Sequence, residues 1–495
     1  MIWLLGYCVE VLFFTGAIWR LRRSVAIVMT GVVGLSALWL AVTFHPPFRA
    51  LFLTLLLFLT VFRLMNLARV IKGRMHERYL LLVTRRTSLF IALYHFIALG
   101  ATLIVAHLPS NIIIETFTLT VLFISLSVFL VTTNNIKKLR FKMPDHFIPD
   151  RELPTVTVAI PARNETSDLE ECLRTVLAND YPKLEVIVLD DCSQDRTAEI
   201  IKSFAHEGVR FVKGLEPDIR WLAKNQAYEK LLEESNGDLI LFCGVDVRLG
   251  LSSIRSMVNL LKAKNKQMLS VLPLRVAGAA GQTVIQPMRY WWELAIPRRL
   301  LNRPAVLSTC WIIDKKTIVN LGGFAAVKHA IIPEGFFARE LVKSDSYSFV
   351  RSSDELDVRT VKNIFEQRQT ALRVRYPQLR RRPETLLAIT LVDLLIFVAP
   401  LVLLVYFGFT AQTFMLVIAT ITLICILFTH LLILQVSNPA NVAVAVVTFP
   451  FSVIMELAIG YISMFSYEFG TIEWKDRNIC IPVMHVYPHL PPLKD

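Results

Sequence analysis

The stretch Thr155-Val-Thr-Val-Ala-Ile160, followed directly by Pro161-Ala-Arg-Asn-Glu165, decides the fold. Its six apolar and β-branched residues predict a buried strand. Two more strands are predicted: Leu184-Glu-Val-Ile-Val-Leu189, which ends in Asp190-Asp191, and Asp238-Leu-Ile-Leu-Phe-Cys243, which ends in Gly244-Val-Asp246. Ligands of an open parallel sheet bind at the carboxyl ends of its strands. Three acidic strand ends indicate a site for an anionic ligand with a metal ion between, such as a nucleotide diphosphate.

Helical patterns alternate with these strands. Ser167 and Glu170 form the pattern of a capping box for a helix through residue 177. Asp195 is suited to cap a second helix through residue 204, and residues 221–234 form a third. Further short strands are expected around 270–276 and 305–313, and Gly322-Gly323 would end a short helix that starts near residue 315. The βαβα order predicts an α/β domain whose mostly parallel sheet is covered on both faces.

The chain is too apolar for a soluble protein. Of its 495 residues 54% are hydrophobic, and the mean hydropathy is +0.52, which predicts several membrane spans. Five apolar segments precede the α/β domain, at 2–19, 24–44, 47–64, 88–107 and 112–133, and three come after it, at 385–407, 413–436 and 442–465. The predicted organisation is a membrane region at 1–144, the α/β domain at 145–383, a second membrane region at 384–466 and an interfacial tail at 467–495.

The basic residues fit a membrane protein better than a nucleic-acid-binding one. The formal net charge of +13 comes largely from Lys and Arg beside apolar segments, where they set orientation. The loop after the third segment and the exit of the fifth are strongly basic, which predicts a multi-pass protein of the cell or inner membrane with a cytoplasmic α/β domain. The N-terminus lacks a positive n-region and a cleavage site, so it is expected to remain as the first span. Seven Cys without a CxxC pair indicate reduced thiols.

The last apolar segment raises a question of topology. Three spans after a cytoplasmic domain would leave the tail on the opposite side of the membrane. However, Pro450 interrupts the last segment, and residues 470–477 are typical of an interface segment. One of the last three segments would then be re-entrant or two short helices, and both topologies remain open.

An ordered set of motifs resembles glycosyltransferase family two over about 230 residues. The set consists of Val158-Ala-Ile-Pro-Ala-Arg-Asn-Glu165, Val188-Leu-Asp-Asp-Cys-Ser193, Leu222-Ala-Lys-Asn225, Val245-Asp-Val-Arg-Leu249 and Leu321-Gly-Gly-Phe324. The resemblance implies a GT-A fold, a nucleotide-sugar donor, and transfer of a sugar to an acceptor hydroxyl with inversion.

The resemblance also implies residues that bind the donor. The end of the first strand would form the wall against the nucleobase and ribose, with Pro161, Ala162, Arg163 and Glu165. Asp190 and Asp191 would accept hydrogen bonds from uracil or ribose, and Lys224 would face the pyrophosphate. The alternatives are that the Asp pair only caps the next helix and that Lys224 is a solvated helix-face residue.

Two motifs depart from the family pattern. The family carries Asp-x-Asp to hold Mg²⁺ or Mn²⁺ on the diphosphate, whereas this chain has Gly244-Val-Asp246. Asp246 would then bind the metal weakly with water in place of the first Asp, the donor would be held without metal, or the protein would be inactive. Where relatives carry Glu-Asp, this chain has Pro333-Glu-Gly335, which makes Glu334 the candidate general base; a loop glutamate in an ion pair is the alternative.

The acceptor is predicted from the part of the chain beyond the candidate base. The Gln-x-x-Arg-Trp motif of processive polysaccharide synthases is absent, whereas the tail Glu473-Trp-Lys-Asp-Arg477 resembles that of integral-membrane members that glycosylate lipids such as ceramide and carotenoids. A lipid or polyprenyl-linked acceptor is therefore expected. A polysaccharide synthase and an inactive nucleotide-sugar-binding membrane protein remain as alternatives.

Charged and aromatic residues in the apolar parts permit two interpretations. Glu115, Asp393 and Glu456 stand in apolar runs, either along an acceptor path or as packed, protonated carboxyls. Trp291-Trp292 belongs to an amphipathic stretch, 288–301, that would lie on the membrane surface or pack internally.

Overall fold

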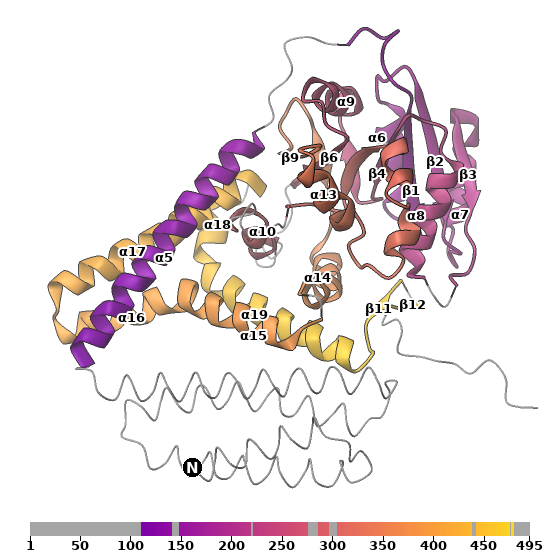
Figure 1. Ribbon diagram of the computed structural model, residues 1–495. Coiled ribbons are helices and arrows are strands. Elements are labelled where there is room, and N and C mark those ends of the chain that lie inside the picture. The colour runs from indigo at the N-terminus through magenta and orange to yellow at the C-terminus, as the bar shows by residue number, and fades with distance from the viewer. Residues whose placement is uncertain are drawn as a thin grey trace, which may run out of the picture.

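The computed structural model describes residues 110–140, 148–218, 221–275, 286–296, 304–379, 381–437, 442–475 and 477–479. The first four predicted apolar segments lie outside these residues. The described chain forms an α/β domain, from which a group of long helices extends to one side (Figure 1).

The centre of the α/β domain is a seven-stranded sheet in the order β3-β2-β1-β4-β8-β6-β9. Its strands are β1 (Val156–Ala162), β2 (Leu184–Asp190), β3 (Val209–Lys213), β4 (Leu239–Cys243), β6 (Met268–Leu272), β8 (Cys310–Asp314) and β9 (Tyr347–Arg351). β3, β2, β1 and β4 run parallel, β8 is antiparallel to both its neighbours, and β6 and β9 are parallel. The predicted mostly parallel sheet is therefore confirmed. A small second sheet joins β5 (Val247–Leu249), β10 (Val358–Thr360) and β7 (Leu274–Arg275).

Both faces of the large sheet are buried. Successive side chains of a strand point to opposite faces: in β1, Val158 and Ile160 enter one core cluster, whereas Ala159 between them enters the other. The helices of the domain are α6 (Leu169–Leu177), α7 (Thr197–Ser203), α8 (Ala223–Glu234), α9 (Ser253–Ala263), α10 (Gln286–Leu294), α12 (Lys315–Asn320), α13 (Glu334–Lys343) and α14 (Ile364–Gln378). This two-sided burial explains why the strands are almost continuously apolar.

The start of α6 differs from the sequence prediction. The helix begins at Leu169, and the predicted capping box from Ser167 does not form, because the Ser167 hydroxyl turns to the Asp168 carboxylate, 3.3 Å away. Asp168 in turn pairs with Arg248 at 3.2 Å. At α7, by contrast, the Asp195 carboxylate, one residue before the N-cap Arg196, accepts a hydrogen bond from the backbone N–H of Thr197, the first residue of the helix, at 3.0 Å.

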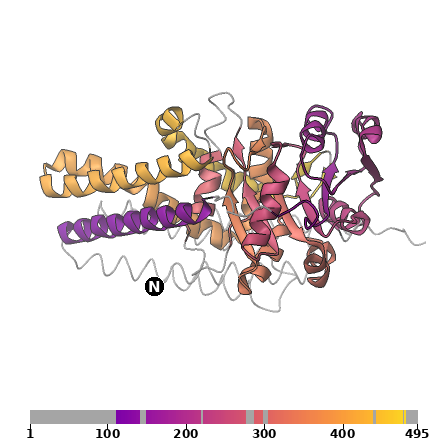
Figure 2. The ribbon, with the colours of Figure 1, turned by 90° about the horizontal axis from the view of Figure 1, so that it is seen from above.

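Four of the described helices are long and apolar enough to cross a membrane. They are α5 (Ser110–Leu139); the continuous helix formed by α15 (Pro383–Asp393), a π-helical turn (Leu394–Val398) and α16 (Ala399–Thr410); α17 (Thr413–Ser437); and α19 (Phe449–Glu468). α5 and α17 lie side by side and point away from the α/β domain (Figures 1 and 2). Large side chains such as Phe123, Phe409 and Phe414 are more than 70% exposed on them, as expected for lipid-facing residues.

The last apolar segment is two helices. α18 (Val442–Val447) and α19 are separated at Thr448, and Pro450 lies in the first turn of α19. α19 packs along α14 of the α/β domain, where the Tyr467 hydroxyl donates to the Arg373 carbonyl at 2.6 Å. The break near Pro450 agrees with the predicted interruption, and α19 is joined to the α/β domain by polar contacts.

Three of the polar and aromatic residues noted in the apolar segments, Glu456, Asp393 and Trp291, are packed inside the structure and not arranged along an acceptor path. Glu456 of α19 forms an ion pair with Arg375 of α14 at 2.7 Å, and each side chain is only 9% exposed. Asp393 is also buried. In α10, Trp291 is buried and its indole N–H donates to His430 Nδ1 of α17 at 3.0 Å, so this helix packs internally. Glu456 and Asp393 are therefore packed carboxyls, as one of the two interpretations of the sequence expected.

The buried pair Arg375–Glu456 generates a stability prediction. We expect Arg375→Met or Glu456→Met to cost about 3–5 kcal/mol each, because either change leaves one buried charge without its partner. The double replacement should recover much of this loss. The measurement is the thermal unfolding temperature in detergent, with Glu340→Gln as control, since its exposed pair with Lys343 should contribute at most about 1 kcal/mol. Equal losses in the single and double variants would contradict the prediction.

Candidate donor site

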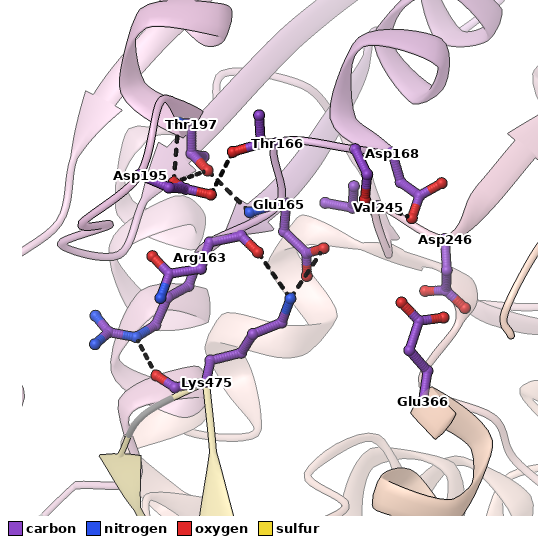
Figure 3. Close-up of polar contacts among 12 residues, drawn as sticks. Arg163, Glu165, Thr166, Asp168, Asp195, Thr197, Val245, Asp246, Glu366 and Lys475 are labelled. Atoms are coloured by element: carbon purple, nitrogen blue, oxygen red, sulfur yellow. Dashed lines mark hydrogen bonds and ion pairs between the residues drawn. The ribbon is translucent and has the colours of Figure 1, made fainter. Parts of the chain in front are cut away.

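A hollow opens where the carboxyl ends of β1 and β4 face α8 and α14. Figure 3 shows charged residues that line it, among them Glu165, Asp246 and Glu366. Its lining includes three of the predicted site residues that are charged, namely Glu165, Lys224 and Asp246, and also Pro161. Three cations that sequence reasoning did not assign complete it: Lys362, Arg373 and Lys475. Four basic side chains around a few carboxylates suit a ligand with more than one negative charge.

The end of β1 is fixed by Arg163. Its guanidinium group is buried and donates to the carbonyl oxygens of Asp191 at 2.6 Å and Cys192 at 2.8 Å. The following Asn164 has a φ of 49°, the left-handed conformation that Asn tolerates better than most residues. Arg163 therefore holds the β1 and β2 loops together, while Ala162 is buried in the sheet and Pro161 faces the hollow.

Glu165 comes after this turn and points toward Lys475, whose ammonium group lies 3.2 Å from its carboxylate. Burial raises the pKa of Glu165, and Asp246 and Glu366 add to the rise, while Lys475 opposes it. Figure 3 shows Glu366 of α14 facing Asp246 across the hollow. Glu165, Asp246 and Glu366 thus all line the hollow, and these carboxylates need cations near them.

The two aspartates after β2 have different environments. Asp190 accepts a hydrogen bond from the Ser193 backbone N–H at 3.2 Å, a contact within the loop before α7 and not a cap of that helix. Asp191 is buried, and its carboxylate lies 2.7 Å from Arg477. Burial raises the pKa of Asp191, although Arg477 opposes this rise. Asp191 also lines a second hollow with Gly214 and Trp221.

Gly214 is required by the close approach of the chain to β2. A Cβ atom at this position would lie 2.5 Å from the Asp190 carbonyl oxygen and 3.0 Å from the Asp191 Cα, both backbone atoms that cannot move aside. The absence of a side chain keeps this second hollow open beside Asp191.

Lys224 is the second residue of α8 and is half-buried. The pKa of Lys224 is lowered to about 8, mainly by loss of solvent and in part by the nearby positive charges of Arg373 and Lys362, while Glu334 and Asp246 oppose the shift. The Asn225 side chain fixes this end of the helix by donating to the carbonyl oxygens of Val327 and Ala330. Lys224 is therefore held in place and is not a solvated surface residue.

Asp246 lies in the turn between β4 and β5. Its carboxylate accepts hydrogen bonds from the Thr360 hydroxyl at 3.1 Å and from the Lys362 ammonium group at 3.3 Å. Burial would raise the pKa of Asp246, but Lys362 and Thr360 outweigh this effect and lower it. A Cβ at Gly244 would lie 2.7 Å from the Asp246 carboxylate, so a larger residue at 244 would force Asp246 to move.

These residues do not fit a metal site built by the protein alone. No group of three or more His, Cys, Asp and Glu side chains among the described residues is arranged to hold a metal ion. Asp246 is instead bonded to an ammonium group, which already neutralises it. The surroundings of Asp246 thus suit a lysine better than a divalent ion, which prefers several free oxygen ligands.

Glu334, the candidate base, is the first residue of α13 and is only 1% exposed. Its negative charge acts on Lys224, which connects it to the hollow, although Glu334 is not part of the lining. The positive end of the helix dipole favours a carboxylate in this first turn. The structure thus brings Glu334 near the other predicted residues through Lys224.

Fold and site together define a domain of the GT-A type, with a mostly parallel sheet and a charged hollow at its strand ends. Residues 157–321 match the model described as "Glycosyl transferase family 2". The chain carries a glycosyltransferase family 2 domain, and the resemblance seen in the motifs is confirmed.

Relatives match mainly in this region. The chain is 38% identical over 100 residues to "Probable glycosyltransferase YdaM" of Bacillus subtilis, covering 19% of this chain and 24% of the relative. It is 28% identical over 124 residues to "4,4'-diaponeurosporenoate glycosyltransferase" of Staphylococcus aureus, covering 25% and 32%. The chain thus spans about a quarter to a third of the length of these relatives.

Among solved structures, a mannosyltransferase from Pyrobaculum calidifontis, solved in complex with GDP-Man and Mn²⁺, is similar at 16% identity with a TM-score of 0.41. The match covers 71% of this chain and 98% of that one.

The lowered pKa of Lys224 gives a prediction on pH. An anion that binds beside the ammonium group needs it protonated and raises its pKa, so affinity should fall as pH rises through about 8. We expect the Kd of UDP to be level below about pH 7.5 and to rise by up to about tenfold per pH unit above about 8. Calorimetric titration from about pH 6.5 to about pH 9.5 measures this. Lys224→Arg is the control, because it keeps its charge and should give a flat profile; a matching slope in that variant would refute the assignment.

Proposed function

We propose that the protein is a membrane-bound inverting glycosyltransferase that moves one sugar from a nucleotide-diphospho-sugar to a hydroxyl of a lipid or polyprenyl-linked acceptor. A UDP-linked donor is proposed because the Asp191 carboxylate suits the N–H of a uracil ring. The observation that carries the proposal is the cation-lined hollow at the strand ends of a glycosyltransferase family 2 domain. The nucleoside would lie against Pro161 and Asp191, and the diphosphate would extend toward Lys224.

The leaving diphosphate gains charge as the glycosidic bond breaks, and fixed cations stabilise this charge. Lys224, Lys362 and Arg373 line the hollow and would supply it. Asp246 would orient Lys362 through their contact at 3.3 Å. The Mg²⁺ or Mn²⁺ ion expected from the family motif is not part of this proposal, since its expected ligand Asp246 is bonded to Lys362.

Glu334 would act as the general base. It would remove the proton from the acceptor hydroxyl while that oxygen attacks the anomeric carbon from the side opposite the leaving diphosphate, which inverts the configuration. Lys224 would lie between Glu334 and the diphosphate, and its ammonium group would interact with the negative charge of each.

The long apolar helices support an acceptor borne by the membrane. α14, which lines the hollow, packs directly on α19, one of the four helices suited to cross or enter the bilayer. An acceptor hydroxyl at the headgroup level would therefore need to travel only a short way to the donor. The basic segments beside the apolar stretches support a cytoplasmic position of the α/β domain.

Sugar transfer is the first function to test. Purified protein in detergent, given UDP- or GDP-sugars and total membrane lipid, should release nucleotide and form a product one sugar heavier than its acceptor. We expect Glu334→Gln to lower kcat by roughly 10²–10⁴-fold, the usual contribution of general base catalysis. Glu340→Gln, on the same helix but paired with Lys343 at the surface, is the control. Mass spectrometry identifies the product, and NMR its anomeric configuration.

Each outcome of this experiment decides between functions. A ladder of products would indicate a polysaccharide synthase. Binding of nucleotide sugar without turnover, even when lipid is present, would indicate a membrane protein that binds nucleotide sugars and is not an enzyme. No binding at all would refute the donor site.

The contact between Lys362 and Asp246 predicts how turnover depends on metal. We expect activity to persist in EDTA, and Lys362→Ala to lower it by about tenfold or more, because the variant removes a cation from the diphosphate. Lys343→Ala, an exposed lysine of α13, is the control. Loss of activity in EDTA with recovery in Mg²⁺ or Mn²⁺, and indifference to Lys362→Ala, would instead establish a metal held through Asp246.

A further inference from the structure

The chain returns to the donor site after its last apolar helix. A short hairpin, β11 (Glu473–Trp474) and β12 (Arg477–Asn478), comes after α19. In Figure 1 this hairpin stands beside the α/β domain near the end of α8, and in Figure 3 Lys475 at its turn points toward the end of β1. Asn164 and Lys475, which meet here, are 311 positions apart in the sequence.

Two basic residues of the hairpin contact the site. The Lys475 ammonium group lies 3.2 Å from the Glu165 carboxylate and donates to the Asn164 carbonyl at 2.8 Å. The Arg477 guanidinium group lies 2.7 Å from the Asp191 carboxylate and 3.3 Å from that of Glu216. The hairpin backbone takes part as well, because the Lys475 carbonyl accepts a hydrogen bond from Arg163 at 2.9 Å.

The hairpin is anchored by an apolar cluster. Ile472 and Ile479 flank the hairpin, are buried, and pack with Tyr376 of α14 and Tyr467 of α19. The Ile479 backbone N–H donates to the Ile472 carbonyl at 3.0 Å and closes the base of the hairpin. Ile479 also lines a small pocket with Lys224 and Arg373. The basic residues are therefore held in position at the site and are not carried by a loose tail.

The charges of the hairpin match those of a nucleoside diphosphate. Lys475 lines the same hollow as Lys224 and Lys362, where the diphosphate is proposed to lie. Arg477 is only 13% exposed and is aimed at Asp191, the proposed partner of the nucleoside. An arginine fork can bind phosphate or carbonyl oxygens as well as a carboxylate, so Arg477 can keep Asp191 ionised and still contact a bound nucleotide.

We propose that Lys475 and Arg477 are donor-binding residues, Lys475 for the diphosphate and Arg477 for the nucleoside end together with Asp191. The C-terminal hairpin is then one wall of the donor site. This inference rests on the proposed function. It also requires residues 472–479 to lie on the same side of the membrane as the α/β domain, which favours the topology in which the broken last segment enters the membrane and returns.

The test is nucleotide binding by the full chain in detergent, measured by calorimetry with UDP or GDP, whichever the wild type binds more tightly. We expect Lys475→Gln and Arg477→Gln each to raise the Kd by about tenfold or more, since each removes a charged partner of the ligand. Glu473→Gln is the matched control, since it lies in the same hairpin, is exposed, and does not line the hollow. It should leave the Kd essentially unchanged.

A second ligand separates binding from a purely structural role. Uridine or guanosine, which lacks the diphosphate, should bind Lys475→Gln as well as it binds the wild type, whereas a disordered hairpin would weaken both ligands equally. Arg477→Lys should recover part of the affinity lost in Arg477→Gln.

Two results would overturn the inference while leaving the proposed function in place. The first is unchanged nucleotide affinity in both hairpin variants. The second is tighter binding in Arg477→Gln. This would mean that Arg477 competes with the nucleotide for Asp191 and is not a ligand of the donor. A wild type that binds neither nucleotide would instead refute the proposed function, and the inference with it.

Discussion

Parallel pairing of β3, β2, β1 and β4 is the constraint on which the rest of the structure depends. Because these strands run the same way, their carboxyl ends meet at one edge, and the residues that come after β1, β2 and β4 gather there. Arg163 then ties the first two strand ends to each other through two backbone carbonyls. Without that pairing Glu165, Asp191 and Asp246 would lie far apart.

The resulting site depends on the balance between its carboxylates and the cations that lie beside them. Partly or fully buried carboxylates are costly unless cations lie near them, and three carboxylates of the site have one: Asp246 has Lys362, Glu165 has Lys475 and Asp191 has Arg477. An incoming diphosphate would compete for the same cations. Before a diphosphate binds, the protein carboxylates thus contact the same cations that the oxygen atoms of the diphosphate would contact afterwards.

Local patterns predicted the part of the site that lies within a single α/β unit. The apolar strands, their acidic ends and Lys224 all fall within 155–246, where strand and helix periodicity is strong. Lys362, Arg373 and Lys475 could not be predicted in the same way, because they reach the hollow from α14, its preceding loop and the C-terminal hairpin, and only long-range packing sets those positions. The capping box predicted from Ser167 was wrong, because the nearby Asp168 carboxylate accepts a hydrogen bond from the Ser167 hydroxyl.

The position of Lys475 and Arg477 so late in the chain sets an order on biosynthesis. A ribosome makes the sheet and the strand ends long before it reaches the hairpin, and α15 to α19 are synthesised in between. The contacts to Glu165 and Asp191 cannot form until those helices have been inserted and α19 has packed on α14. A nascent or truncated chain would therefore have a folded α/β domain whose acidic pocket still lacks two of its cations, and full assembly of the membrane part would come before completion of the site.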